Sequence, residues 1–107
     1  MITQEDAEKA LEYIVDNAPE LAKAKATKEY LEQYRKSQKA ILFNGAPKGR
    51  LDDQLNFAYA HPDYTEFLEK LRIAIEEYEK LSWYMKAAGI KVDAWRTQES
   101  SRRVSGP

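Results

Sequence analysis

Apolar residues recur at alternating intervals of three and four positions through the second half of the chain. Because such a repeat keeps one narrow stripe of a helix facing its neighbours, it predicts a long helix over residues 62–102 that packs side by side with other helices. We therefore expect an all-α fold, an elongated helical hairpin with a long C-terminal heptad-patterned helix and a short N-terminal helix. Ten residues form the stripe: Tyr64, Phe67, Leu71, Ala74, Tyr78, Leu81, Met85, Ala88, Val92 and Trp95.

The first half of the chain predicts two further helices separated by a break. Thr3 followed by Asp6 is typical of a capping box, which predicts an N-terminal helix within residues 1–18. Proline is tolerated in the first turn of a helix but not in its interior. Pro19 therefore predicts a break before a second, basic helix over residues 20–43.

The segment that follows predicts a reversal of the chain. Two Gly and one Pro lie between positions 44 and 50, and turn formers this close together end helices. A loop and a short helix are expected over residues 44–60, with Leu51, Leu55 and Ala58 facing inward. Residues 103–107 are expected to form a tail, and the whole chain to form a single domain.

The composition excludes several classes of site. The chain of 107 residues contains no Cys and one His, so it cannot form a disulfide, a thiolate metal site or a Cys nucleophile. Its apolar runs are too short to span a bilayer, and its first residues lack the basic and apolar parts of a signal peptide. We expect a cytoplasmic protein, in the host cytoplasm if a phage encodes it, with no membrane segment and no cofactor.

Charge is segregated along the chain although the net charge is only −1. Residues 23–50 carry eight basic and two acidic residues, and the segments on either side carry an acidic excess. Clustered Lys and Arg bind phosphates, and Tyr rings stack on single-stranded bases. A solvated helix face, or ion pairs with the acidic segments, would explain the same residues. The candidate nucleic-acid-binding residues are Lys28, Tyr30, Tyr34, Arg35, Lys36, Lys39, Lys48 and Arg50.

Carboxylates one helical turn apart raise the question of a metal-dependent enzyme. Glu66 with Glu69, and Glu76 with Glu79, have the spacing with which helical nucleotide pyrophosphohydrolases hold Mg²⁺. The sequence offers no matching pair on a neighbouring helix, and nearby Lys and Arg can pair with these acids. His61 has no Cys or second His to act with. We expect no metal site, no catalytic residue and no enzymatic activity.

The layout of the chain is similar to that of phage recombination mediators of the UvsY type, and to that of small helical proteins encoded beside phage recombination genes. The features that carry the resemblance are the basic Tyr-containing segment 30–39, the Gly-containing loop and the end of the long helix at residues 87–96. It implies an all-α protein that assembles into rings through its C-terminal helices, binds single-stranded DNA and helps to load a recombinase. The mediators' basic residues before the loop correspond to Lys36 and Lys39, and their assembly surface to residues 78–96.

The sequence therefore predicts a phage-type DNA recombination or replication accessory protein that binds single-stranded DNA non-enzymatically. Its expected partners are further copies of the chain, single-stranded DNA, and a recombinase or other DNA-processing protein. The alternative is a protein-interaction module, an adaptor or inhibitor that docks a host or phage DNA-processing protein through acidic helix faces. The predicted oligomer interface consists of seven stripe residues: Leu71, Tyr78, Leu81, Met85, Ala88, Val92 and Trp95.

Overall fold

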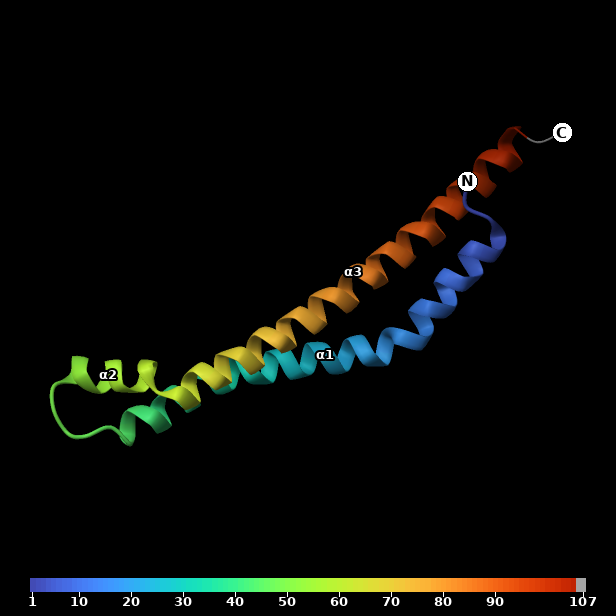
Figure 1. Cartoon of the computed structure of the whole chain (residues 1–107). Coiled ribbons are helices and arrows are strands. Elements are labelled where there is room, and N and C mark those ends of the chain that lie inside the picture. The colour runs from blue at the N-terminus through green and yellow to red at the C-terminus, as the bar shows by residue number, and fades with distance from the viewer. Residues whose placement is uncertain (106–107) are drawn as a thin grey trace. The chain divides into compact units, whose positions relative to one another are not determined.

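Three helices account for nearly all of the chain. The computed structural model describes residues 1–105, in which α1 spans Gln4–Asn44, α2 spans Leu51–Ala60 and α3 spans Pro62–Ser105 (Figure 1). This part of the chain contains no strand. The all-α prediction is confirmed.

The described residues form two compact units, and α1 and α3 contribute to both. The central unit comprises residues 24–78 and contains all of α2. The terminal unit comprises residues 1–23 and 79–105.

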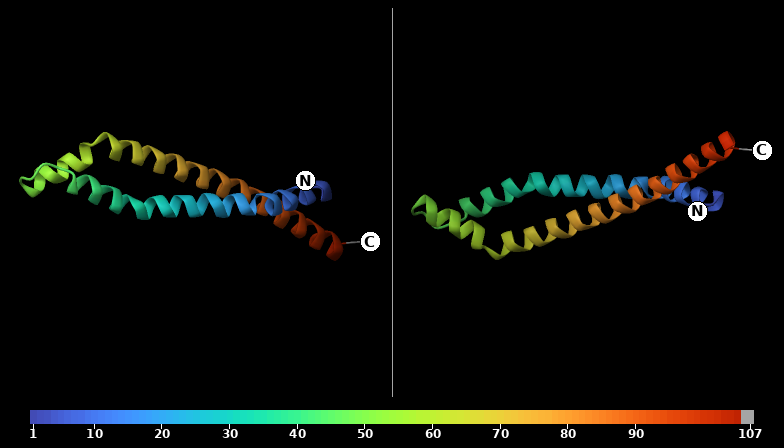
Figure 2. Two further views of the ribbon diagram at one scale, coloured as in Figure 1. Left: turned by 90° about the horizontal axis from the view of Figure 1, so that it is seen from below. Right: turned by 90° about the horizontal axis from the view of Figure 1, so that it is seen from above.

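In the central unit, α1 and α3 run side by side in opposite directions (Figure 2). Tyr34 of α1 contacts Phe67 of α3, with ring centroids 5.8 Å apart. Earlier in α1, the Lys28 ammonium lies over the ring of Tyr78, which comes later in α3 than Phe67. The contacts therefore define an antiparallel helix pair, closed at one end by the loop and α2.

The same pairing occurs separately in the terminal unit. The backbone N–H of Ile2 donates to Oε1 of Gln98 at 3.1 Å, and Nε2 of Gln98 donates to the Ile2 carbonyl at 2.7 Å. Ala7 and Ala10 of α1 and Ala88 of α3 are buried. These small side chains let the two helix segments approach closely.

The heptad stripe of α3 is buried within the single chain over residues 64–74. Tyr64, Phe67, Leu71 and Ala74 are at most 9% exposed, because they face α1 in the central unit. A helix of the same chain is held at a high effective concentration, so it covers the stripe without the cost of association. These four stripe residues are therefore covered without another subunit. Of the predicted interface residues, Leu71 and Ala88 are buried, and the other five are half-buried: Tyr78, Leu81, Met85, Val92 and Trp95.

The predicted capping box is present at the start of α1. Oγ1 of Thr3 accepts a hydrogen bond from the Asp6 N–H at 3.0 Å, and the Thr3 N–H donates to Oδ2 of Asp6 at 3.1 Å. The Thr3 backbone N–H is the main reason that the pKa of Asp6 is lowered, with the Thr3 hydroxyl second. Both hydrogen bonds satisfy N–H groups that a helix terminus otherwise leaves free.

The predicted break at Pro19 is wrong, because α1 continues through this residue. Proline removes one backbone hydrogen bond and crowds the carbonyl four residues earlier, that of Val15. Val15 is 65% exposed, so the affected carbonyl lies toward solvent and water can satisfy it. Asn17 adds a hydrogen bond from Nδ2 to the Tyr13 carbonyl at 2.9 Å. The ribbon of α1 bends in its blue part (Figure 1), as expected where proline interrupts a helix. The segments predicted as helices 1–18 and 20–43 are therefore one helix.

The predicted loop and short helix are present, with one orientation wrong. α2 follows the loop, and Ala58 is fully buried in a cluster with Leu42 and Tyr64. Leu55 is half-buried, whereas Leu51 is 63% exposed and does not face inward. Leu51 is the first residue of α2, two turns before the buried Ala58.

His61 lies between α2 and α3 and caps both. Its N–H donates to the Ala58 carbonyl at 3.4 Å, and its Nδ1 accepts from the Asp63 N–H at 3.0 Å. This role at a helix junction needs no Cys or second His.

At its C-terminal end, α3 runs to Ser105 rather than to residue 102. Arg102 and Arg103 lie in the last turn, where the helix dipole stabilises positive charge. The expected tail is helical over residues 103–105, and its last two residues lie outside the described part.

Candidate interaction surfaces of the central unit

The residues predicted to bind nucleic acid all belong to the central unit, but they do not form one surface. Successive residues of a helix are rotated by about 100°. Lys28, Arg35 and Lys39 therefore lie on one side of the buried stripe of α1, and Tyr30 and Tyr34 lie on the other. We call the first set, together with Lys36, the basic side. The cations of α1 and these tyrosines therefore do not form one continuous row along the helix.

Several of the predicted cations already have intrachain partners. The Lys28 ammonium lies 4.5 Å from the centre of the Tyr78 ring and 3.9 Å from Oε1 of Glu32. The Lys39 ammonium lies 4.7 Å from the centre of the Tyr59 ring. Arg35 and Lys36 are exposed, as are Lys48 and Arg50 in the loop, where Arg50 lies 3.9 Å from a carboxylate oxygen of Asp52. The basic side is thus a row of cations that partly covers aromatic rings.

The tyrosines lie in a groove between α1 and α3. Tyr30 stacks on Tyr34 with ring centroids 6.0 Å apart and planes 17° apart, and Tyr34 packs against Phe67 at 46°. Tyr30 is 65% exposed, so one end of this aromatic row is open to solvent. We call this feature the aromatic groove; it has a volume of about 470 Å³ and is lined by Tyr30, Leu31, Tyr34, Gln38, Asp63, Glu66, Phe67 and Lys70.

The charges around the aromatic groove are mainly acidic. Asp63 and Glu66 contribute carboxylates from the first turns of α3, and Lys70 lies 4.0 Å from Oε1 of Glu66. The single cation of the groove is therefore partly neutralised by its neighbour. Phosphate groups would meet two carboxylates here, whereas a cationic side chain would meet complementary charge.

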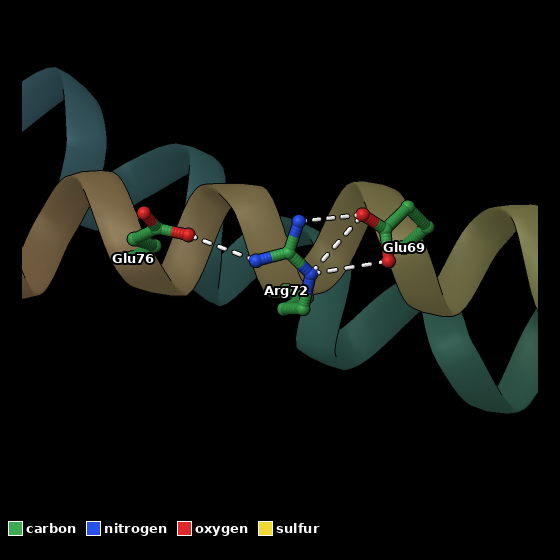
Figure 3. Close-up of polar contacts among 3 residues, drawn as sticks. All are labelled: Glu69, Arg72 and Glu76. Atoms are coloured by element: carbon green, nitrogen blue, oxygen red, sulfur yellow. Dashed lines mark hydrogen bonds and ion pairs between the residues drawn. The ribbon is translucent and has the colours of Figure 1, made fainter.

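The exposed outer surface of α3 carries an ion-pair network beside this region. Arg72 lies between two carboxylates: its Nε is 3.1 Å from both Glu69 oxygens, and its Nη1 is 2.9 Å from Oε2 of Glu76 (Figure 3). The hydrogen bonds from Arg72 lower the pKa of Glu69 and, in turn, raise the pKa of Arg72. Two of the carboxylates considered for Mg²⁺ are therefore held by an arginine. Among residues 1–105, no group of three or more His, Asp or Glu side chains is placed to hold a metal ion.

The sequence contained part of the signal for the aromatic groove. The spacing of four between Tyr30 and Tyr34 places both rings on one helix face. Their contact with Phe67 and their position relative to the carboxylates of α3 depend on how the two helices align, which the sequence pattern does not give.

No helix within residues 1–105 combines the length and apolar character needed to cross a membrane. Comparisons with protein-family models, with curated proteins and with solved structures find no match to this chain.

Proposed function

We propose that this protein is a helical protein-interaction module whose aromatic groove binds a basic, apolar segment of a partner protein. The observation that carries this proposal is the exposed Tyr30 ring, stacked on Tyr34 in a groove that is also lined by two carboxylates, those of Asp63 and Glu66, and one cation, Lys70. Exposed aromatic rings backed by other rings are typical anchors of protein interfaces, because they bury much apolar area at a small entropic cost.

The chemistry of the groove selects the kind of partner. A Lys or Arg side chain laid on the open face of Tyr30 would gain a cation–π interaction of about 0.5–2 kcal/mol. Further cations of the partner segment would meet the carboxylates of Asp63 and Glu66, which line the same groove. An aliphatic neighbour in the partner would fill the space beside Tyr34 and Phe67. The groove is open and lies between two helices, which suits one or two side chains of a partner helix or extended segment.

DNA-processing proteins offer segments of this kind, because their own substrate is a polyanion that they bind with clustered Lys and Arg. They are also the partner class that the resemblance to phage recombination mediators implies. The proposal therefore favours the adaptor or inhibitor among the functions expected from the sequence. In this role the protein would occupy a basic surface of its partner, as a competitor or as a tether.

Binding of single-stranded DNA is a second candidate function, favoured by one observation. Arg35, Lys36 and Lys39 lie close together on the basic side of α1, and Lys28 continues this row although its stem packs beside Tyr78. This basic side could contact successive phosphates without stacking on Tyr30 or Tyr34. Its signature is an affinity for labelled oligo(dT) that falls steeply with salt, with a slope that Arg35→Ala reduces by about one.

Fluorescence anisotropy separates the two functions. The probe is a short labelled peptide that places Leu, Lys and Arg at helical spacing, and the control peptide carries Glu in place of Lys and Arg. We expect the basic peptide to bind, the acidic peptide not to bind, and Tyr30→Ala to weaken binding about tenfold. Asp63→Asn combined with Glu66→Gln should weaken it as well. The matched control Tyr84→Ala removes an exposed tyrosine of the terminal unit and should leave the affinity unchanged. Equal binding of both peptides, or no effect of Tyr30→Ala, would refute the proposal.

A further inference from the structure

The terminal unit exposes large apolar side chains that the central unit's function does not use. On α3, Trp83 is 63% exposed and Ile90 is 62% exposed. On α1, Leu11 is 54% exposed and Val15 is 65% exposed. All four lie away from the stripe that joins α1 to α3. Isolated apolar residues on a surface are ordinary, whereas a contiguous apolar patch marks an interaction site. Leu11 and Val15 are one helical turn apart, and Trp83 and Ile90 are two turns apart on one face with Ala87 between them.

The exposed residues of α3 form a socket for a helix. Trp83, Lys86, Ala87 and Ile90 occupy positions i, i+3, i+4 and i+7, the four corners of the hole that receives a side chain from a facing helix. Ala87 is small, so it leaves room in the middle of this socket for a side chain of the facing helix. The large side chains of Trp83 and Ile90 form the two ends of the socket. The Lys86 ammonium lies 4.5 Å from the centre of the Trp83 ring, which gives the socket a positive edge.

The exposed residues of α1 form a ridge with the opposite charge. Glu8, Leu11, Glu12 and Val15 are related by the same i, i+3, i+4 and i+7 spacing. Each of the two large apolar residues therefore has a carboxylate one turn before it. The first 22 residues contain six acids and one Lys, whereas residues 81–107 contain five bases and two acids. The ridge and the socket are complementary in both apolar content and charge.

We infer that the terminal unit binds a second copy of this chain, with the ridge of one protomer seated in the socket of its partner. The two surfaces lie on different helices of the same unit, so each copy offers one of each. In the complex, Val15 would insert between Trp83 and Ile90 over Ala87, and Glu8 or Glu12 would meet Lys86. This self-association uses none of the stripe residues, which already pack within the chain, and it is independent of the aromatic groove.

Sedimentation velocity of the full chain over a range of concentrations tests this inference. We expect the mass to rise with concentration, and Trp83→Ala and Leu11→Ala each to weaken the association about tenfold or more. Sensitivity to Leu11 separates this contact from a pairing of α3 with α3, which would depend on Trp83 alone. A monomer at all concentrations, or association unaffected by Leu11→Ala, would overturn the inference.

Charge reversal provides a rescue that misfolding cannot imitate. Glu8→Lys with Glu12→Lys makes the ridge basic, and Lys86→Glu makes the socket acidic, so each variant alone should be monomeric. When the two variants are mixed, the basic ridge of one meets the acidic socket of the other, and association should return. Circular dichroism should show the same helix content in both. If the mixture stays monomeric while the unaltered chain associates, charge pairing between ridge and socket is wrong.

Discussion

Lys28 places its ammonium 4.5 Å from the centre of the Tyr78 ring, at the edge of the buried stripe of α1. The Lys28 side chain is only 21% exposed. Its aliphatic stem therefore packs between the helices, while the charged end remains at the edge, near Glu32. A cation predicted from the sequence to bind phosphate is thus part of the packing between α1 and α3.

This position makes a substitution at Lys28 informative. Lys28→Met keeps the length of the stem and removes the charge, so we expect the free energy of unfolding to stay the same or rise by up to about 1 kcal/mol. Lys28→Ala should lower it, because the stem no longer fills the space beside Tyr78. Urea denaturation measures both values. A loss of stability in Lys28→Met equal to that in Lys28→Ala would mean that the charge, rather than the stem, is what matters.

Ala58 should tolerate no larger side chain. It is fully buried against Leu42 and Tyr64, so Ala58→Leu would overpack the junction of α2 with the other helices. We expect a loss of about 1–3 kcal/mol in the free energy of unfolding. Ala60→Leu is the matched control, since Ala60 is exposed in the last turn of the same helix. The midpoint of thermal denaturation should be clearly lower for Ala58→Leu than for Ala60→Leu. Equal midpoints would contradict the packing described for α2.

The capping box of α1 predicts a dependence of stability on pH. Thr3→Ala should lower the free energy of unfolding by about 1 kcal/mol at neutral pH, because the N–H of Asp6 loses its acceptor. Folding lowers the pKa of Asp6, so the stabilisation from its carboxylate is present above the ordinary pKa and is lost as the pH falls through the lowered value. Thr3→Ala keeps the backbone N–H but removes the hydroxyl, the second cause of the lowered pKa of Asp6, so its effect should be somewhat larger at neutral pH than in strong acid. Thr27→Ala, at an exposed position inside α1, should show no such dependence.

The Arg72 network makes a prediction that nuclear magnetic resonance can check. Arg72→Gln removes the donor that lowers the pKa of Glu69, so the pKa of that carboxylate should rise toward its ordinary value. In the unaltered chain, the stabilisation from Glu69 is present above its ordinary pKa and is lost in acid as the pH falls through the lowered value. A titration of the Glu69 side chain that is the same with and without Arg72 would show that the two do not interact in solution.

The periodicity of the sequence predicted the long helix correctly but could not identify what covers it. A stripe such as Leu71 and Ala74 shows that a helix face is apolar, and the same stripe suits another subunit or another helix of the same chain. The answer depends on the turn between α1 and α3, which brings the two stripes of one chain together. The break predicted at Pro19 is wrong for a related reason. Its local cost is small on the solvent side of a helix whose other side packs along its neighbour, and packing then decides the outcome.

Helix geometry alone predicts the separation of the tyrosines from the cations. Lys28 and Tyr30 are neighbours in the sequence, but two residues correspond to about 200° of rotation around the helix. A count of basic and aromatic residues in one segment therefore does not describe a surface. The carboxylates of Asp63 and Glu66 are more than thirty residues from Tyr30 in the sequence, and only the alignment of α1 with α3 brings all three into one groove.

The most direct test of this account is the response of the Tyr30 ring to a basic, apolar peptide. With ¹³C-labelled tyrosine in the full chain and Tyr30→Phe to assign the signal, the ring resonances can be followed during titration with the peptide and, separately, with oligo(dT). The account predicts that Tyr30 and Tyr34 shift saturably with the peptide, while Tyr84 does not move. If the Tyr30 ring resonances do not shift with the peptide, or shift with the oligonucleotide instead, the aromatic groove is not a site for a basic protein segment.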